Sequence, residues 1–379
     1  MKLQSVRIKN FKAIIDSKTV KFGPLTAFIG HNGAGKSSLI EALETYQSIV
    51  RDGLDIAMQR WLGIEHARHK SQEAKERAGD LTNPIAFELA LGDSPRKTTR
   101  LHLAINNDPA VNRMFIASES IEIPAADSIK IAPPFSNPSG NTESLQARRS
   151  KLAIAPEDYP VLSKQILDWQ FLAMNPDAMG LPVPQQRTGG GVRLAKDGSN
   201  IADYLLDIRQ LDINAFNGIV ETMAFVLPYA RDIQPAITSE LERKTWLQLT
   251  EADFKVPGWM LSTGTLRLLA LLALLRHPKP PPLIVVEEIE NGLDPRSIHL
   301  IVEEIRNAVL EGTTQVILTT HSPYLLDLLT LDHLVLVERD AKGQPCFRRP
   351  GNDASLTQWA KDFAPGRLYT MGNLSRIKP

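Results

Sequence analysis

Eight consecutive residues near the N-terminus have the types and spacing of a phosphate-binding loop. They read Gly30-His31-Asn32-Gly33-Ala34-Gly35-Lys36-Ser37 and fit the pattern G-x-x-x-x-G-K-[ST], with an apolar stretch before them and helical spacing of apolar residues after them. Glycines let backbone N–H groups turn around phosphate oxygens, and a helix start adds positive charge. We predict that Lys36 neutralises the β- and γ-phosphates of a nucleotide and that Ser37 offers its hydroxyl to Mg²⁺.

Two adjacent carboxylates follow a second apolar stretch. The run Leu283-Ile284-Val285-Val286 is typical of a buried strand, and it delivers Glu287 and Glu288 at its end. Because side chains alternate across a strand, the two carboxylates cannot do the same job while the strand geometry persists. We assign Glu287 to Mg²⁺, through water, and Glu288 to polarising the attacking water as a general base.

A histidine and a serine-glycine pair are also suited to phosphate chemistry. Thr319-Thr320-His321-Ser322 ends the next predicted strand, where ligands bind in open α/β sheets. His321 can therefore hydrogen-bond a γ-phosphate oxygen or the attacking water. The run Leu261-Ser262-Thr263-Gly264-Thr265 precedes an apolar helix, so Ser262 and Gly264 predict a second anion site at a helix N-terminus.

The elements that must position these residues alternate as they do in α/β proteins. An apolar helix (266–276), a strand (283–288), an amphipathic helix (297–310) and a strand (315–320) predict a buried, mostly parallel sheet. Strand-like segments at 84–91, 100–105, 114–123 and 151–155 predict an antiparallel lobe. We expect an exposed helix or excursion over the charged residues 56–80, loops at 133–145 and 188–191, helices over 201–229 and a strand at 244–250.

In this order, the motifs resemble those of the ATP-binding-cassette class of P-loop ATPases. The resemblance is to RecF/SMC-type heads and to small prokaryotic AAA-family ATPases akin to OLD-family and AbiEii-type proteins. It is carried by Ile8-Lys9-Asn10-Phe11-Lys12, the phosphate loop with Ser38, Asp197-Gly198-Ser199-Asn200-Ile201-Ala202, Ser262-Thr263-Gly264-Thr265-Leu266-Arg267, Glu287-Glu288-Ile289-Glu290-Asn291-Gly292-Leu293-Asp294-Pro295 and Thr320-His321-Ser322-Pro323.

The resemblance implies a fold, a ligand and an oligomer. The fold is an ABC-ATPase head with a mostly parallel core sheet, an antiparallel β lobe and an inserted helical lobe. The expected parts are an N-terminal ATPase lobe (1–160), an inserted, largely helical lobe (161–260), a C-terminal ATPase lobe (261–340) and a tail (341–379). ATP with Mg²⁺ would be sandwiched between two copies of the chain, with hydrolysis to ADP and phosphate opening and closing the dimer.

The resemblance also implies residue roles. Nucleotide binding falls to Gly30, Asn32, Gly33, Ala34, Gly35, Lys36, Ser37 and Ser38, and the metal to Ser37 and Glu287. Ser262 and Gly264, the signature motif, would bind the γ-phosphate of ATP held by the second copy. Asn291 to Asp294 correspond to the D-loop, which communicates between the two sites, and His321 to the switch histidine. Asp294 with Pro295 also suits a plain helix start.

Three departures from the class matter. Thr263-Gly264-Thr265 stands where transporters carry Gly-Gly-Gln, which argues against a transporter subunit. The metal carboxylate is Glu287 where most of the class has Asp. The glutamine that usually touches Mg²⁺ has two candidates, Gln165 and Gln170, and the sequence does not choose between them.

Composition limits the remaining functions. The 379 residues carry 43 basic and 43 acidic side chains, so the whole-molecule field cannot hold a polyanion and any DNA contact must be local. Candidate basic spots are Arg96-Lys97-Arg100, Arg148-Arg149-Lys151 and Arg348-Arg349. The longest apolar run, Leu268 to Leu275, is too short for the roughly 20 residues of a membrane span. A charged N-terminus and the single Cys346 favour a reducing cytoplasm.

We expect a cytoplasmic ATPase that acts in DNA repair or genome defence with an effector from a neighbouring gene. One alternative is a nucleotide-gated scaffold or toxin partner with no DNA-directed activity. Another is an OLD-type nuclease, which is disfavoured because 58 residues follow His321 and they contain no convincing Asp-x-Asp pair.

Overall fold

The computed structural model describes residues 1–70, 83–94, 97–108, 113–124, 129–131, 135–136, 145–186, 191–239, 242–360 and 362–374. The chain forms two compact units. The first comprises Met1–Trp169, Leu331–Asp362 and Met371–Pro379, and the second comprises Gln170–Thr330 and Phe363–Thr370. Both units are therefore built from segments that are far apart in the sequence.

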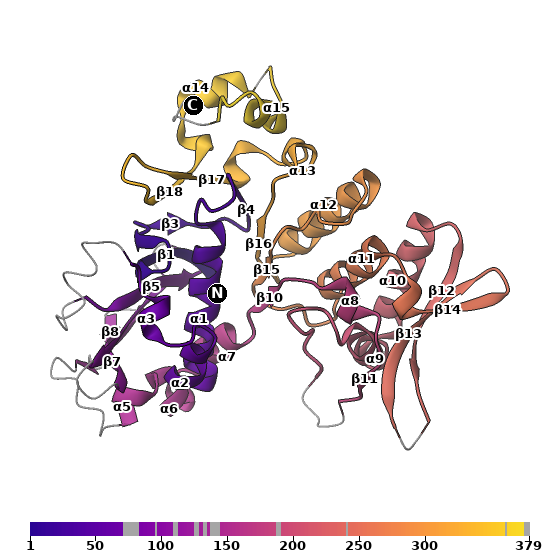
Figure 1. Ribbon diagram of the computed structural model, residues 1–379, viewed down its shortest axis with the longest axis horizontal. Helices are drawn as coiled ribbons and strands as arrows, with labels where there is room; N and C mark the ends of the chain where they lie inside the picture. The colour runs from indigo at the N-terminus through magenta and orange to yellow at the C-terminus, as the bar shows by residue number, and fades with distance from the viewer. Residues whose placement is uncertain are drawn as a thin grey trace. The chain divides into compact units, whose positions relative to one another are not determined.

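The first unit contains an antiparallel sheet and a smaller group of strands that holds the phosphate loop (Figure 1). Its strands are β1 (Lys2–Phe11), β2 (Ile14–Asp16), β3 (Val20–Lys21), β4 (Leu25–Ile29), β5 (Ile85–Gly92), β6 (Thr98–Asp108), β7 (Arg113–Pro124), β8 (Ile129–Ile131), β9 (Phe135–Ser136), β17 (Leu334–Arg339) and β18 (Pro345–Arg348). Its helices are α1 (Lys36–Asp52), α2 (Leu54–Gln59), α3 (Ile64–Ala67), α5 (Leu145–Arg148), α6 (Lys151–Ile154), α7 (Pro160–Leu167) and α14 (Ala354–Trp359).

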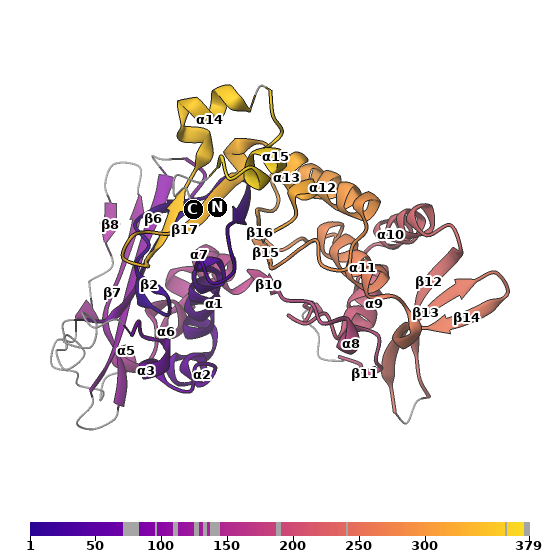
Figure 2. The ribbon, with the colours of Figure 1, turned by 45° about the horizontal axis from the view of Figure 1, so that its top comes forward.

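The antiparallel sheet buries one face under α1, which runs beside the sheet in Figure 2. Its strands run in the order β2-β1-β5-β6-β7-β8, with β3 on β1 and β9 on β7. Apolar and polar side chains alternate along β5, so Phe87 and Leu89 are buried while Glu88 is half-exposed. Phe11 and Phe87 of the sheet and Tyr46 of α1 form an aromatic cluster with ring centroids 5.9 and 6.2 Å apart. This cluster fixes α1, and with it the loop that precedes α1.

In the smaller group, β4 pairs in parallel with β17, and β18 returns antiparallel to β17. The register places Ala27 opposite Leu334 and Ile29 opposite Leu336. Every residue of β4 is buried, which is expected of a strand covered on both faces.

The second unit contains three parallel strands and a separate antiparallel sheet. Its strands are β10 (Gln170–Leu172), β11 (Val183–Pro184), β12 (Ala230–Ile237), β13 (Lys244–Glu251), β14 (Phe254–Pro257), β15 (Ile284–Val286) and β16 (Val316–Thr319). Its helices are α8 (Pro176–Met179), α9 (Ile201–Leu211), α10 (Ile213–Val226), α11 (Thr263–Leu275), α12 (Pro295–Leu310), α13 (Pro323–Asp327) and α15 (Pro365–Thr370).

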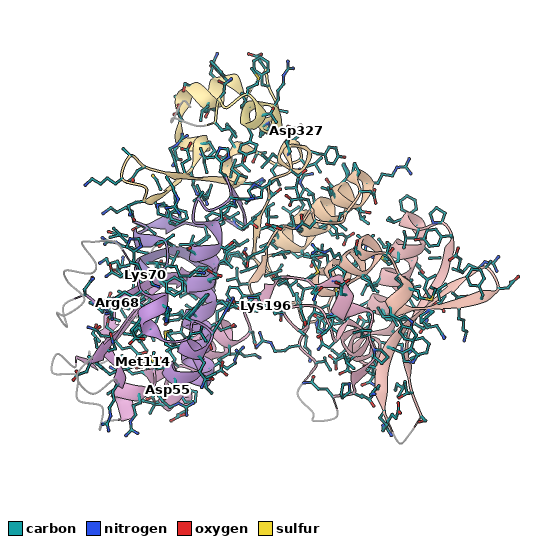
Figure 3. The ribbon with its side chains drawn as sticks, in the orientation of Figure 1. Asp55, Arg68, Lys70, Met114, Lys196 and Asp327 are labelled. Carbon is teal, nitrogen blue, oxygen red and sulfur yellow. The ribbon has the colours of Figure 1, made fainter. Side chains whose placement is uncertain are left out.

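The parallel strands run β10-β15-β16, and α11 packs against α12 beside them. Gln170 lies opposite Ile284, and Val286 lies opposite Leu318, so β15 and β16 end at the same edge. The late segment α15 packs on α13, the helix that carries Asp327 (Figure 3). The Gly366 N–H of α15 donates to Asp327 Oδ1 at 2.7 Å. The predicted α/β alternation of the last third is therefore present.

The predicted secondary structure needs one correction and several additions. Residues 151–154 form α6 rather than a strand, because the Ser150 hydroxyl caps a helix by accepting from the Leu152 N–H at 3.2 Å. Strand β13 matches the predicted strand at 244–250, but it belongs to a sheet with β11, β12 and β14 that accompanies the helices of the inserted segment. The charged stretch 56–80 begins with α2 and α3; its residues 71–80, most of 133–145, and 188–190 lie outside the described residues.

Candidate nucleotide site

The phosphate loop lies between β4 and α1, and backbone packing requires two of its glycines. A Cβ on Gly30 would lie 2.1 Å from the Val337 carbonyl oxygen of β17. A Cβ on Gly35 would lie 2.7 Å from Pro345 Cγ of β18, and Gly35 is left-handed, with φ of 116°. The hairpin of β17 and β18 therefore presses on the loop so closely that only glycine fits at either position.

Lys36 is buried inside the loop. Its Nζ donates to the carbonyl oxygens of Gly30, at 2.6 Å, and His31, at 3.1 Å. From outside, Arg339 of β17 donates Nε and Nη2 to the Gly33 carbonyl oxygen at 3.0 and 2.6 Å. Three carbonyl oxygens of the loop are therefore directed toward Lys36 and Arg339, so they do not repel an anion.

The loop meets the electrostatic requirements of a phosphate site. It opens α1, a helix of 17 residues whose first turn holds no acidic side chain and begins with Lys36. The positive end of the helix and the ammonium group thus act in the same place. Ser37 and Ser38 follow in the first turn, where a serine hydroxyl is a suitable ligand for Mg²⁺. These residues fit a nucleotide phosphate with its metal ion.

In the second unit, the two predicted carboxylates differ in their surroundings. Strand β15 ends at Val286, and the Glu287 N–H still donates to the Leu172 carbonyl oxygen at 3.1 Å. Glu287 is half-buried, whereas Glu288 is exposed and has a φ of 48°, a left-handed conformation that costs a non-glycine residue of order 1–3 kcal/mol. Asn291 Nδ2 donates to Glu288 Oε2 at 2.5 Å. The chain thus leaves the strand at this pair and separates the two groups by a turn.

Hydrogen bonds join this acidic loop, residues 287–291, to the histidine loop, residues 319–322. The Glu288 N–H donates to Thr319 Oγ1 at 2.8 Å, and the Ile289 N–H to the Thr319 carbonyl oxygen at 3.3 Å. Glu290 accepts from the backbone of the histidine loop in return. The sequence analysis gave Thr319 and Glu290 no role. Both residues lie within motifs that the sequence analysis singled out, which could have marked them as candidates. Their hydrogen bonds to the opposite loop are seen only in the structure.

The signature residues lie at the exposed start of α11. Ser262 caps the helix, since its Oγ accepts from the Thr265 N–H at 3.1 Å. Ser262 and Thr263 are exposed, and the first turn contains no acidic residue. A Cβ on Gly264 would lie 2.4 Å from the Gly292 carbonyl oxygen. The predicted signature and the predicted D-loop are therefore in backbone contact.

Asp294 caps the start of α12, as its position before Pro295 led us to predict. Its Oδ1 accepts from the backbone N–H groups of Arg296, at 2.9 Å, and Ser297, at 3.2 Å. The Ser297 hydroxyl donates to Oδ2 at 2.6 Å. The hydroxyl bond, followed by the backbone bonds, lowers the pKa of Asp294, because these donors stabilise the charged form.

The remaining predicted residues are placed as follows. Gln170 is buried in β10 and donates Nε2 to the Leu194 carbonyl oxygen at 2.7 Å, whereas Gln165 lies on α7 of the first unit. The choice between them as a metal-contacting glutamine stays open. Asn200 of the Asp197–Ala202 phrase supports the turn before α9, where its Oδ1 accepts from the Ala195 N–H at 2.7 Å. His321 follows β16 and is half-buried.

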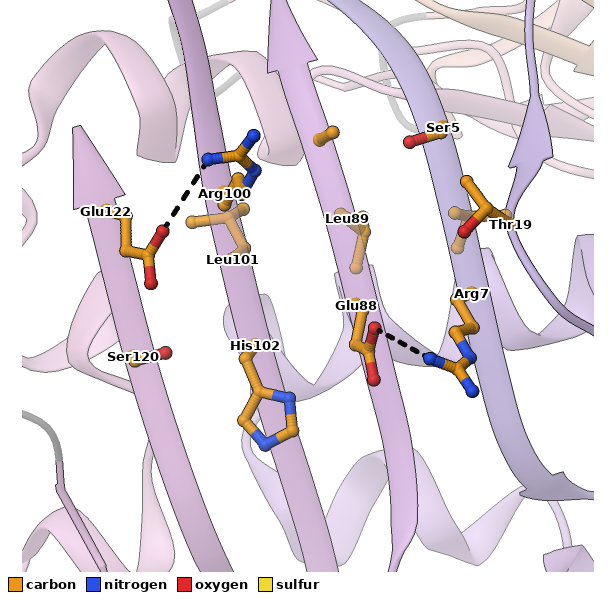
Figure 4. Close-up of a pocket in the computed structure, with 12 residues that line it drawn as sticks. Ser5, Arg7, Thr19, Glu88, Leu89, Arg100, Leu101, His102, Ser120 and Glu122 are labelled. Carbon is orange, nitrogen blue, oxygen red and sulfur yellow. Dashed lines mark ion pairs between the residues drawn. The ribbon is translucent and has the colours of Figure 1, made fainter. Parts of the chain in front are cut away.

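The proposed basic spots are partly occupied by internal contacts. Arg349 donates to the carbonyl oxygens of Asp332 and Lys21 at 2.7 and 2.9 Å. Arg100 lines a cavity of about 330 Å³ on the outer face of the antiparallel sheet, and it pairs with Glu122 at 4.0 Å (Figure 4). Arg7 and Glu88 pair across the same cavity at 3.9 Å. Its charges compensate one another, which does not suit a polyanion.

Two negative findings apply to the described residues. Among them, no group of three or more histidine, cysteine, aspartate or glutamate side chains is arranged to hold a metal ion. The helices found there are also too short or too polar to span a membrane.

A phosphate loop that opens a helix, a capped second helix, and paired acidic and histidine loops at strand ends are the parts of a P-loop ATPase. The fold agrees: a solved SMC head bound to the C-terminal winged-helix domain of ScpA aligns with a TM-score of 0.58 at 14% identity, over 92% of this chain and 98% of the other. Residues 25–327 match the family described as "AAA domain, putative AbiEii toxin, Type IV TA system". The chain belongs to this family.

Two curated proteins are also similar. An "ATP/GTP phosphatase" of Helicobacter pylori is 22% identical over 344 residues, which cover 86% of this chain and 87% of that protein. The "Nod factor export ATP-binding protein I" of Sinorhizobium fredii is 29% identical over 164 residues, 43% of this chain and 44% of that protein. The first similarity spans both units and the second spans less than half of the chain.

Proposed function

We propose that the chain hydrolyses ATP within an ATP-sandwiched homodimer, in which each site combines the phosphate loop of one copy with the signature helix of the other. Lys36 and the start of α1 would bind the phosphates, and Ser37 and Glu287 would hold Mg²⁺. Bound Mg²⁺ would supply positive charge that neutralises the transferring phosphoryl group. Glu288 would accept the proton of the attacking water, and His321 would hold that water or a γ-phosphate oxygen.

The exposed start of α11 is the single observation that most directly supports an ATP-sandwiched dimer. A capped helix of 13 residues presents Ser262 and Thr263 to solvent, without an acidic residue in its first turn. Such a terminus attracts an anion. It is in backbone contact with Gly292, the residue after Asn291, and Asn291 hydrogen-bonds Glu288. An anion at α11 would therefore act directly on the loop that carries the proposed base.

A complementation experiment tests the sandwich. Lys36→Ala removes the phosphate charge, and Ser262→Arg blocks the signature helix, so each homodimer carries a defect in both sites and should be inactive. In a mixed dimer both lesions fall in one site, and the other site has an intact Lys36 and an intact Ser262. We expect the mixture of the two inactive proteins to regain ATPase activity.

Two controls accompany the mixture. Cross-linking of differently tagged copies shows whether mixed dimers form, and each inactive protein assayed alone gives the activity expected without complementation. Lys18→Ala mixed with Lys36→Ala is the reference for an active copy beside an inactive one, because Lys18 is exposed and pairs with Asp16, so Lys18→Ala should stay active. Full activity of Ser262→Arg as a monomer would contradict the sandwich and leave Ser262 as a helix cap.

For the biological setting, we propose DNA repair or genome defence together with an effector protein. The composite, nucleotide-dependent dimer supports this, because opening and closing can transmit ATP hydrolysis to a partner. A second candidate is a toxin partner in a toxin–antitoxin pair, and the description of the family favours it. Nuclease and growth-inhibition assays of the chain alone and with the products of adjacent genes separate the two.

A further inference from the structure

We propose that Glu290 is a positioning residue for ATP hydrolysis: its carboxylate fixes the backbone of His321 against the acidic loop without touching nucleotide. The proposal rests on the hydrolytic function proposed above. It concerns a residue that has no part in phosphate binding, metal binding or proton transfer in that mechanism.

The contacts of Glu290 are directed to the backbone of the histidine loop. Glu290 Oε1 accepts from the N–H groups of two successive residues, His321 at 2.6 Å and Ser322 at 3.1 Å. Hydrogen bonds to an ionised acceptor are shorter and stronger than neutral ones. Two donors on one oxygen also fix the direction of the peptide between them, so the position of the His321 Cα follows from Glu290.

The other carboxylate oxygen shows that this arrangement is costly. Glu290 Oε2 is buried, and it has no hydrogen-bond partner in the part of the chain that the structure describes. Burying a charged oxygen without a partner is unfavourable, and an apolar or smaller side chain would avoid this cost. A residue that serves stability alone would not need a second, unpaired oxygen here. We therefore attribute the presence of a glutamate at position 290 to the two hydrogen bonds that its Oε1 accepts.

Thr319 completes the connection from the opposite side. Its hydroxyl and carbonyl oxygens accept from the N–H groups of Glu288 and Ile289. The two loops follow neighbouring parallel strands whose last paired residues are Val286 and Leu318. Together the four bonds make the acidic loop and the histidine loop one body. Loss of the Glu290 bonds would release His321 while the Thr319 bonds still hold Glu288.

The variants Glu290→Ala, Glu290→Asp and Glu290→Gln test the proposal in the full-length protein. Alanine removes the acceptor, and aspartate keeps the charge but is one methylene too short to reach. Glutamine keeps an oxygen at the right distance and loses the charge. Since small misplacements at a reacting centre can cost about 100-fold, we expect kcat to fall by roughly 10- to 100-fold in the first two variants and to recover largely in the third. The affinity for ATP should stay within about twofold of wild type, because phosphate binding resides elsewhere.

Asp212→Ala is the matched control. Asp212 also accepts from two successive backbone N–H groups, those of Asn214 and Ala215, but at the start of α10. A purely structural carboxylate of this kind should lower thermal stability and leave kcat unchanged. Equal kcat losses in Asp212→Ala and Glu290→Ala at equal stability would overturn the proposal, as would wild-type kcat in both Glu290→Ala and Glu290→Asp.

Hydrogen–deuterium exchange separates this proposal from the function on which it rests. The amide proton of His321 should exchange faster in Glu290→Ala and Glu290→Asp than in wild type, and at nearly the wild-type rate in Glu290→Gln. The Ser322 N–H also donates to Thr320 Oγ1 at 3.0 Å, so its exchange should change less. Unchanged exchange in the first two variants overturns the positioning role whatever the activity. If exchange is faster in these two variants but the wild-type protein itself hydrolyses no ATP, the positioning of His321 stands, and the proposed function is refuted together with the catalytic consequence of Glu290.

Discussion

Glu288 is the residue at which local structure and proposed chemistry meet most closely. It holds a left-handed backbone conformation that its side chain does not favour, and Thr319 fixes its N–H. Asn291 Nδ2 contacts its carboxylate, so the side chain of the proposed base is oriented by the predicted D-loop. A strained residue held by its neighbours is typical of sites where geometry matters more than stability.

Glu288→Gln should bind ATP with Mg²⁺ yet hydrolyse it about 100-fold or more slowly, because an amide keeps the shape but cannot accept the proton of water. Nucleotide binding measured by fluorescence and phosphate release measured in the same buffer check this. The variant should also accumulate as a dimer in sedimentation experiments with ATP and Mg²⁺.

Glu287→Gln is the comparison for that variant, because it makes the same replacement of a carboxylate by an amide at the neighbouring residue. We expect it to weaken the dependence of binding on Mg²⁺. Wild-type turnover by Glu288→Gln, with loss of hydrolysis alone in Glu287→Gln, would reverse the assignment of the two groups.

At the scale of elements, the site depends on how helix starts meet loops. Helix α11 begins against Gly292, and Asp294, two residues later, caps the start of α12. One short segment therefore ends the acidic loop, supports the signature helix and caps the next helix. A substitution in the acidic loop, at the start of α11 or at the start of α12 should therefore alter the other two.

Gly264→Ala should lower both stability and ATPase activity. Its Cβ would lie 2.4 Å from the Gly292 carbonyl oxygen, so one of the two backbones must move. Overpacking of this kind costs about 1–3 kcal/mol. Urea denaturation measures the cost. Gly218→Ala in the interior of α10 is the control: its Cβ meets only Arg276 Nη1 at 3.6 Å, and it should stabilise by about 0.5–1 kcal/mol. Equal stability of the two variants would contradict the backbone contact.

Asp294→Asn should change how stability depends on pH. The pKa of Asp294 is lowered in the folded protein, mainly by the Ser297 hydroxyl, so ionisation stabilises the fold above the unfolded pKa of about 4. That contribution is lost as pH falls through the lower folded pKa. Asparagine caps as well but does not ionise. The difference in melting temperature between wild type and variant should be largest near pH 7 and shrink below pH 4; a constant difference would contradict this.

At the scale of the whole molecule, local sequence patterns were sufficient for the elements and for the residue types of the site. The strand before Gly30, the helix after it and the strand before the two carboxylates are local features, and each was predictable from periodicity. The predicted strand at 283–288 is shorter in the structure, where β15 ends at Val286. The class also followed, because several motifs occur in the required order. Family and fold comparisons agree with it.

The rest depends on contacts between distant segments. Glu290 meets His321 across 31 residues, and Arg339 meets Gly33 across 306. No spacing rule predicts such pairs. The wrong strand at 151–155 has the same origin in part, because a short apolar run is ambiguous until the Ser150 cap is seen to form. Sheet neighbours of β13 likewise follow from pairing rather than from its own residues.

If the dimer acts on DNA, binding should require its closed state. The net charge of the chain is zero, and Arg349 is engaged with backbone carbonyls, so single copies should bind weakly. We expect affinity for a DNA duplex to rise when ATP is added to Glu288→Gln and to fall steeply between 50 and 200 mM salt, with a log–log slope of about −0.9 per phosphate contact. Binding that ignores both ATP and salt would contradict a DNA-directed role for the closed dimer.

The pairing of β4 with β17 has a consequence for biosynthesis. The strand that leads into the phosphate loop is made at the beginning of translation, whereas its neighbour, which also presses on Gly30, is made about 300 residues later. At 5–20 residues per second the ribosome needs roughly 15–60 s for that interval. During this time an apolar strand edge waits without its partner and is open to wrong pairing. A nascent chain stalled before Leu334 should therefore fail to retain ATP, and chaperones would have to protect it until synthesis reaches the hairpin.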